Sequence, residues 1–421
     1  MAEKNYKKVL WQTTNESWID PDNLKVIQFE PTSFCNLRCP RCSRTDDTTL
    51  LPTAHIVRFQ QHIDLSLIDS MIKDLPNLER VKMDGDIGDA MMHPKIYEIC
   101  KIIKKRSPNT LVQINTNGCA GKDNTFRKIL ELGSVFFVLG IDGLEDTNHI
   151  HRTGANWKII KRRLEMIRDI APWKHKWRWL DFDYNKHQKD VAKEMAFDHK
   201  INMFEVAPAY SDSNDFINEV IEDKKSGRRN QKGQMLKKDG TPIVKEYYDF
   251  DTDEPYNKDS QFRAEKEYLD GQINAYKDEW HVCPWQQQEM IQVMSTGQVW
   301  PCCWSSEMQI FATRYGYEKL AGSSFVANTS KDLQYKMSDW FRKLGPNWVE
   351  DITLREDYSL RDVLESKSYS KLAVLLKKKK GNYNLSFCSI SCGSFTETEK
   401  RIGGFLTNKV TGYKKKRQLR A

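Results

Sequence analysis

Three cysteines stand close together in the stretch CNLRCPRC, at Cys35, Cys39 and Cys42. Thiolate sulfur binds zinc and iron–sulfur clusters, and the number of thiols separates the two. A structural zinc ion is closed by four protein ligands, whereas each iron of a cubane cluster takes one thiolate. Three thiols leave one iron open to a small molecule. The spacing therefore favours a [4Fe–4S] cluster, and a zinc site completed by a distant His or Cys stays open.

Composition narrows the class of protein. The chain has 421 residues and no apolar stretch long enough to span a membrane, and its first residues, MAEKNYKKVLWQ, form no signal-peptide core. We therefore expect a cytoplasmic protein, in which ten cysteines indicate metal binding rather than disulfides. The net charge of +8 allows an acidic partner, but the acidic and basic residues are mixed, which is typical of a solvated surface.

Short β-rich runs alternate with amphipathic helical segments from residue 24 to about residue 210. Six such periods predict a parallel sheet in an α/β fold, a partial (β/α)6 barrel short of the eight periods of a full one. Chemistry in these folds collects at the carboxyl ends of the strands, and the cysteine loop follows the first strand. The strands are expected at residues 24–29, 81–83, 111–115, 135–140, 177–184 and 203–208.

The rest of the chain changes character. Residues 211–280 are charged and weakly periodic, which predicts a linker or mobile insert. Residues 281–395 contain a hairpin pattern in EMIQVMSTGQVW and a helical pattern from Leu360 to Leu376, so we expect a smaller α+β domain there. Residues 1–23 are expected to form an N-terminal extension. Residues 396–421 form a basic tail, read as a frayed terminus with RNA contact as the alternative.

The spacing Cys35-x3-Cys39-x2-Cys42, directly after a first strand, resembles the signature of the radical S-adenosylmethionine (SAM) enzymes. The resemblance implies that these cysteines hold a [4Fe–4S] cluster whose open iron binds the amino and carboxylate groups of SAM. An electron then cleaves SAM, and the 5′-deoxyadenosyl radical removes a hydrogen atom from a substrate. The residue before the third cysteine is usually aromatic in this family. Here it is Arg41, whose guanidinium can also stack on a purine.

Segments after the later strands resemble further parts of the family's SAM site. Gly88 and Asp89 match a segment that holds the cofactor's amino group, although a glycine-rich turn with a solvated acid is the alternative. Thr116 and Asn117, in the sequence NTNG, would then contact the ribose, and a tight turn that needs Asn-Gly is equally consistent with them.

The segment GIDGLEDTNHIHR is similar to the family's Ser-x-Asp-Gly…Arg element. The resemblance implies that this segment approaches the ribose and the methionine carboxylate of SAM, that Asp142 belongs to the cofactor site, and that Arg152 pairs with the carboxylate. Gly140 replaces the serine, so that hydroxyl contact is lost or supplied elsewhere. Val206, on the sixth strand, is expected to line the adenine.

Five later cysteines resemble the auxiliary-cluster domain of the SPASM and twitch subgroup, with a Gly-x4-Cys element at Gly297 and Cys302. Five are too few for the full SPASM form, so the twitch form with one auxiliary [4Fe–4S] cluster fits better. Cys303 is left out because adjacent strand residues point to opposite faces. The same thiols would also suit a structural zinc ion. The expected ligands are Cys283, Cys302, Cys388 and Cys392.

Together these features predict a radical SAM enzyme that acts on a peptide or protein, the substrates of most members of the subgroup. An RNA or nucleotide substrate is the alternative, and a non-catalytic, zinc-stabilised nucleic-acid-binding protein is the alternative from another class. The resemblance also implies an electron donor such as flavodoxin or ferredoxin. No residue stands out as a general acid or base.

Overall fold

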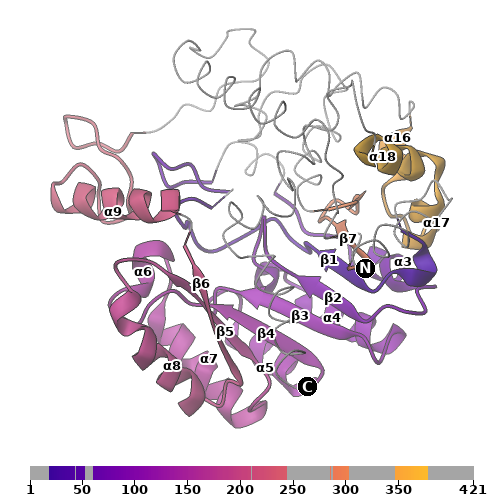
Figure 1. Cartoon of the computed structure of the whole chain (residues 1–421), viewed down its shortest axis with the longest axis horizontal. Coiled ribbons are helices and arrows are strands. Elements are labelled where there is room, and N and C mark those ends of the chain that lie inside the picture. Colours follow the sequence, from indigo (N-terminus) through magenta and orange to yellow (C-terminus); the bar gives the residue numbers. More distant parts are fainter. Residues whose placement is uncertain are drawn as a thin grey trace, which may run out of the picture.

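A computed structural model describes most of the first 243 residues and two later segments (Figure 1). The predicted basic tail, and the predicted N-terminal extension up to residue 18, lie outside these residues. Among the helices of the described residues, none is long and apolar enough to cross a membrane. The described residues are 19–42, 44–52, 60–209, 211–243, 285, 288–302 and 347–377.

Six parallel strands form the main part of the sheet, in the order in which they occur along the chain. This arrangement confirms the predicted α/β fold with a partial barrel. Apolar residues alternate with polar ones along several strands, as in KWRWLD of β5, because successive side chains point to opposite faces. The strands are β1 (Val26–Phe29), β2 (Arg80–Met83), β3 (Leu111–Thr116), β4 (Val135–Gly140), β5 (Lys176–Asp181) and β6 (Met203–Pro208).

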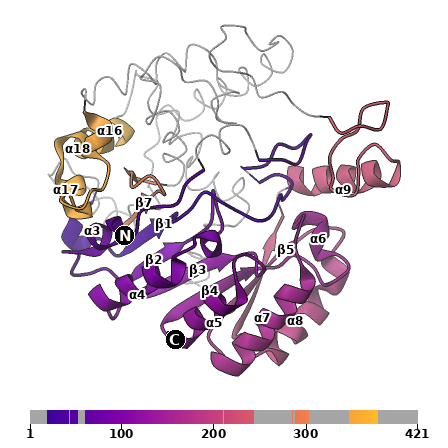
Figure 2. The same ribbon diagram turned by 180° about the vertical axis from the view of Figure 1, so that it is seen from behind.

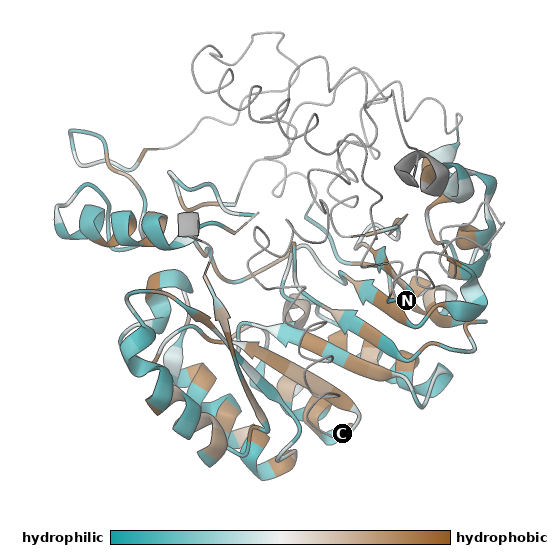
Figure 3. Cartoon of the chain, in the orientation of Figure 1, coloured by the Kyte–Doolittle hydropathy of each residue, from teal (hydrophilic) through white to brown (hydrophobic). Residues whose placement is uncertain are grey.

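Helices α4, α5, α7 and α8 cover one face of this sheet (Figures 1 and 2). Their apolar sides face the strands and their polar sides face outward (Figure 3). The helices are α3 (Leu67–Ile72), α4 (Ile96–Arg106), α5 (Asp123–Glu131), α6 (Asn148–His151), α7 (Trp157–Ile170) and α8 (Lys189–Asp198), and the short 3-10 turns are η1 (Pro21–Asn23), η2 (Ala90–Met92) and η3 (Lys186–Gln188).

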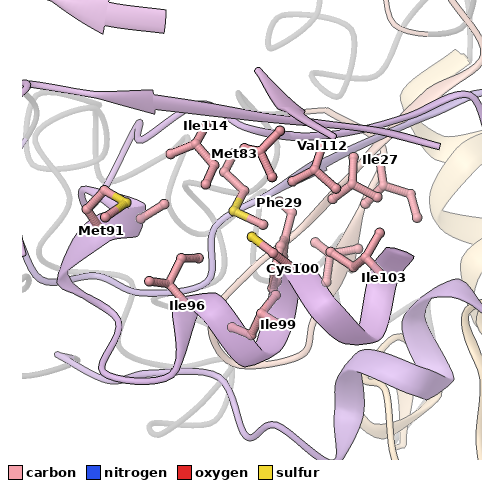
Figure 4. Packing of buried hydrophobic residues seen from close by; sticks show 14 of the residues in the cluster. Ile27, Phe29, Met83, Met91, Ile96, Ile99, Cys100, Ile103, Val112 and Ile114 are labelled. Atoms are coloured by element: carbon pink, nitrogen blue, oxygen red, sulfur yellow. The ribbon is translucent and has the colours of Figure 1, made fainter. Parts of the chain in front are cut away.

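Helix α4 shows how sequence spacing builds the core. Ile96, Ile99, Cys100 and Ile103 recur at helical spacing and are all fully buried. They face strand residues such as Ile114 (Figure 4). Each fully buried aliphatic side chain contributes about 2 kcal/mol. Cys100 is therefore a core residue.

The later segment adds two strands to the same sheet. Strand β7 (Met290–Val293) pairs in parallel with β1, and β8 (Val299–Trp300) pairs antiparallel with β7, so the predicted hairpin is confirmed. In the described residues the sheet order is β6-β5-β4-β3-β2-β1-β7-β8. Helices α16 (Trp348–Asp351), α17 (Leu360–Glu365) and α18 (Lys367–Lys377) lie beside this edge (Figure 1), and their buried residues share one core with the barrel.

A helix forms where sequence analysis expected a charged linker or insert. Helix α9 (Ser211–Lys225) follows β6, and residues 226–243 turn back toward the loop after Cys42. The buried guanidinium of Arg229 anchors this return. It donates to the carbonyls of Asp47 and Gly233 at 3.0 and 2.9 Å, and its Nε lies 3.1 Å from the carboxylate of Asp223. Residues 244–280 lie outside the described residues, so the division proposed at 211–280 stays a prediction.

Candidate active site at the carboxyl ends of the strands

The cysteine loop leaves the carboxyl end of β1, at the edge of the sheet where chemistry was expected. Cys39 is buried, and Cys35 and Cys42 are partly buried. The loop is held by its own backbone, since Cys42 N–H donates to the Cys39 carbonyl at 3.2 Å. A second bond joins it to the segment after β4, because Arg38 N–H donates to the Thr153 carbonyl at 3.0 Å. The loop is thus held by one hydrogen bond within itself and by one to the segment after β4.

The three thiols lie close enough to influence one another. Burial raises the pKa of the Cys35 thiol to about 12. Burial also raises the pKa of Cys39, where the Arg152 guanidinium opposes the rise and the thiols of Cys42 and Cys35 add to it. The thiols of Cys35 and Cys39 are therefore protonated at neutral pH, and metal binding would release their protons.

The donor set of this loop fits a cluster with one open iron. Three thiols come from one loop, and N–H groups face the sulfurs, since Leu37 N–H donates to Cys35 Sγ at 3.4 Å and the Arg152 side chain hydrogen-bonds Cys39. Such bonds support the thiolate ligands of clusters. In the described part of the chain no group of three or more His, Cys, Asp and Glu side chains is placed to hold a metal ion.

Gly88 and Asp89 pack directly against the start of the cysteine loop. A Cβ atom on Gly88 would come 2.1 Å from the Thr32 carbonyl oxygen, so only glycine fits there. Asp89 N–H donates to the Phe34 carbonyl at 2.8 Å. The structure therefore places these two predicted residues beside the loop that carries the thiols.

The side chain of Asp89 joins this segment to the end of β3. Its carboxylate accepts hydrogen bonds from the Thr116 hydroxyl and the Asn117 N–H, both at 2.9 Å, and from Met91 N–H at 3.0 Å. Burial raises the pKa of Asp89, and these donors oppose the rise. Three of the predicted site residues are thus in direct contact. A carboxylate has about four acceptor positions, so one remains for a ligand.

Asp142 and Arg152 form a buried ion pair, with 2.6 Å between Arg152 Nε and Asp142 Oδ2. His151 Nδ1 lies 2.8 Å from the same carboxylate. Burial would raise the pKa of Asp142, but the Arg152 guanidinium and the hydrogen bond from His151 outweigh it and lower that pKa to about 2. Asp142 is therefore ionised, and it holds Arg152 beside Cys39.

The glycine that replaces the family's serine makes room for this arginine. A Cβ atom on Gly140 would come 2.9 Å from Arg152 Nη2. The guanidinium thus occupies space that a side chain at position 140 would contest. The sequence gives no sign that the glycine at position 140 and the arginine at position 152 are related. The structure shows that they are in contact.

Two other predicted residues stand apart from this group. Val206 is 40% exposed on β6, at the far end of the sheet from the cysteine loop. Cys302 is buried and packs with Trp285 and Met290. Cys283, Cys303, Cys388 and Cys392 lie outside the described residues, so the ligand set of the auxiliary cluster stays a prediction.

Two arginines of the cysteine loop contact partners that the sequence did not identify. The guanidinium of Arg41 lies 4.9 Å from the centre of the Phe216 ring. It also forms an ion pair with Asp47 at 3.1 Å. Arg44 is buried and donates to the carbonyls of Ser33 and Ile87. No sequence pattern marks these partners, because they come from distant segments.

Polar side chains on the face of the sheet away from the helices form a second group that sequence reasoning missed. Gln28 Nε2 donates to Asp86 at 2.7 Å, and Asn115 Nδ2 donates to Asp84 at 2.8 Å. The alternation of polar and apolar residues in β1, β2 and β3 is the signal that could have identified this face.

Residues 29–172 match the family model of the Radical SAM superfamily. The chain therefore contains a radical SAM domain, which includes the cysteine loop and the residues from Gly88 to Arg152, and it is an enzyme. The predicted radical SAM domain is confirmed at this level. The match does not extend to the SPASM or twitch subgroup.

The chain is similar to the tungsten-containing aldehyde ferredoxin oxidoreductase cofactor-modifying protein of Pyrococcus furiosus, with 26% identity over 133 residues. That stretch covers 31% of this chain and 34% of the relative, so the chain spans about a third of the length of this curated protein.

Two solved structures are similar at low identity. Streptococcus suis SuiB bound to the precursor peptide SuiA is 14% identical, with a TM-score of 0.42 over 90% of this chain and 78% of that one. BtrN in complex with AdoMet and 2-DOIA is 12% identical, with a TM-score of 0.33 over 84% of this chain and 87% of that one. Likenesses of this size carry no information about function.

Proposed function

We propose that this enzyme cleaves SAM reductively and removes a hydrogen atom from a peptide or protein substrate. One observation carries the proposal. Three thiols from a single loop lie at the carboxyl edge of the parallel sheet, inside the segment that matches the Radical SAM superfamily. When bound together, a reduced [4Fe–4S] cluster and SAM supply the 5′-deoxyadenosyl radical that attacks the substrate. The thiols of Cys35, Cys39 and Cys42 would hold that cluster.

The residues around the loop would orient SAM. The remaining acceptor position of Asp89 suits the cofactor's ammonium group, and a cation there would offset the cost of a buried carboxylate. Thr116 uses its hydroxyl hydrogen on Asp89 and accepts from Gly118 N–H at 3.4 Å, which leaves one lone pair for a ribose hydroxyl.

Arg152 would supply a positive charge for the methionine carboxylate of SAM. Its ion pair with Asp142 engages Nε, and a guanidinium has five N–H donors. Asp142 would then act by holding that guanidinium in place. Val206 remains our prediction for the adenine contact, and Cys283, Cys302, Cys388 and Cys392 remain our prediction for a second cluster.

The first experiment measures metal content and SAM cleavage. Protein purified without oxygen should be brown, and about eight irons per chain would support two cubane clusters. With a strong reductant it should convert SAM to 5′-deoxyadenosine. Replacing Cys35, Cys39 and Cys42 with Ala should abolish cleavage while the second cluster stays. Two zinc ions and no iron, or cleavage that survives the replacement, would contradict the proposal.

The second experiment tests the substrate class. The enzyme is mixed under reducing conditions with deuterated peptide pools or deuterated RNA pools, and transfer of deuterium into 5′-deoxyadenosine is measured by mass spectrometry. Transfer from peptides is expected. Transfer from RNA alone would remove the peptide assignment while keeping the radical chemistry.

A further inference from the structure

The side chain of Asn117 lies between the end of β3 and the cysteine loop. Its Oδ1 accepts from the backbone N–H and the thiol of Cys119, at 2.9 and 3.1 Å. Its Nδ2 donates to Asn36 Oδ1 at 2.8 Å and lies 3.9 Å from Cys35 Sγ. The orientation of the amide follows from these partners, because a backbone N–H can only donate.

These contacts use the whole hydrogen-bonding capacity of Asn117. A side-chain amide has two acceptor positions on its oxygen and two N–H donors. Cys119 fills both acceptor positions, and Asn36 and Cys35 take the two donors. Asn117 is also buried. A ribose hydroxyl could bond the side-chain amide of Asn117 only if one of these contacts broke. The ribose contact predicted from the resemblance would therefore cost a hydrogen bond that holds the folded structure.

Asn36 contacts both Asn117 and Cys119. It directly follows Cys35, and its Nδ2 donates to Cys119 Sγ at 3.4 Å while its Oδ1 accepts from Asn117. Asn36 and Asn117 are 81 positions apart in the chain. We call Asn36, Asn117 and Cys119 the asparagine clamp. The clamp ties the residue beside Cys35 to the end of β3, so it restricts where the Cys35 thiol can lie.

We propose that Asn117 is a positioning residue of the cysteine loop, acting through Asn36 and Cys35, rather than a ribose contact. The inference rests on the proposed function, in which Cys35 is a cluster ligand. Leu37 N–H and Asn117 Nδ2 are the donors that face the Cys35 sulfur. N–H donors stabilise the extra negative charge of a reduced cluster, so their loss makes the reduction potential more negative.

The first test uses metal-free protein and therefore does not depend on activity. Amide hydrogen exchange of residues 35–42 is measured in the wild type, Asn117→Ala, Asn36→Ala and the double variant. Each single variant should speed exchange about fivefold, the effect of losing roughly one net hydrogen bond. The double variant should add little, because both residues serve one arrangement.

Asn115→Ala is the matched control. Asn115 lies on β3, two residues before Asn117, and its amide bonds Asp84 and Gln113 instead of the cysteine loop. This variant should leave exchange of residues 35–42 unchanged. Equal exchange in the wild type and Asn117→Ala would overturn the clamp.

The second test uses the cluster-loaded enzyme and Asn117→Leu. This variant removes both N–H donors and adds no charge beside the Cys35 sulfur. We expect a more negative reduction potential of the cluster, and a SAM affinity per loaded cluster within about threefold of the wild type. A ribose role predicts the opposite pattern: Asn117→Ala would weaken SAM binding more than tenfold with normal exchange and potential, and Asn36→Ala would be silent.

The asparagine clamp and the proposed function can be refuted separately. If the wild-type protein bound no iron, the proposed function would be lost, whatever the exchange experiment showed. If the wild type cleaved SAM while both asparagine variants matched it in exchange and potential, the clamp would be lost and the proposed function would stand.

Discussion

The buried carboxylate of Asp142 lies 2.6 Å from Nε of Arg152, and the same guanidinium borders the Cys39 thiol. Asp142 also accepts from Leu180 N–H at 2.9 Å, so one side chain joins the end of β5 to the segment that carries Arg152. The charge that faces the cysteine loop is thus held by an anion that the fold encloses completely.

Asp142→Asn should destabilise the protein strongly. Removing one member of a buried ion pair leaves the other charge without compensation, which costs about 3 kcal/mol or more. Urea unfolding of the metal-free protein measures the change. Asp169→Asn is the control, because Asp169 pairs with Arg168 in an exposed position and its loss should change the free energy of unfolding little. A similar effect of the two substitutions would show that the pair contributes little.

Gly88→Ala should disturb the contact between the segment after β2 and the cysteine loop. The added Cβ would overlap the carbonyl of Thr32, and backbone cannot move aside cheaply, so we expect a loss of about 2 kcal/mol. Gly240→Ala serves as the comparison: it has a φ of +81° with open space around it, so it carries only conformational strain of about 1 kcal/mol. Thermal unfolding reports both. The expected order would be refuted by a Gly88 variant more stable than the Gly240 variant.

Arg229→Lys should loosen the loop at residues 44–52. The buried guanidinium reaches several carbonyls and Asp223 at once, and a lysine ammonium cannot reproduce that fork. We expect a loss of about 2 kcal/mol and faster hydrogen exchange in the loop. Arg228→Lys is the matched control, since Arg228 is exposed and shares the partner Asp223 at 2.6 Å. Unchanged exchange in Arg229→Lys would contradict the anchoring role.

His175 should make stability depend on pH. Burial lowers the pKa of His175 from its ordinary value of 6.5 to about 4, and its Nδ1 accepts from Phe137 N–H at 3.1 Å. The unfolded chain takes up a proton near pH 6.5, whereas the folded chain does so only near pH 4. The free energy of unfolding should therefore fall as pH drops between these values, by up to about 3 kcal/mol.

Urea unfolding at pH 7 and pH 5 compares the wild type with His175→Asn, whose side-chain oxygen can accept the same bond. Carboxylates titrate in this range too, so the difference between the two proteins is the informative quantity. The variant should lose less stability on acidification than the wild type. Parallel losses would rule out His175 as the source.

Local pattern was enough to predict much of the molecule. The order of strands and helices along the chain follows from alternating β-rich and helical segments, and the helical spacing of Ile96, Ile99, Cys100 and Ile103 marks the buried face of α4. Gly297, with a φ of +81°, lies in the hairpin turn that the sequence Ser-Thr-Gly predicted. These features depend on residues a few positions apart, whose periodicity reports which face is buried.

Tertiary structure decided the contacts that give the site its form. Three of these contacts join distant segments. They are the pairing of β7 with β1, the packing of the Arg152 guanidinium against Gly140, and the hydrogen bond between Asn36 and Asn117. The spacing of Cys35, Cys39 and Cys42 was sufficient to suggest a cluster, and the family resemblance added Asp89 and Arg152 to the expected site. Which donor meets which acceptor depends on how the loops pack, and no periodic pattern in one segment records a partner in another.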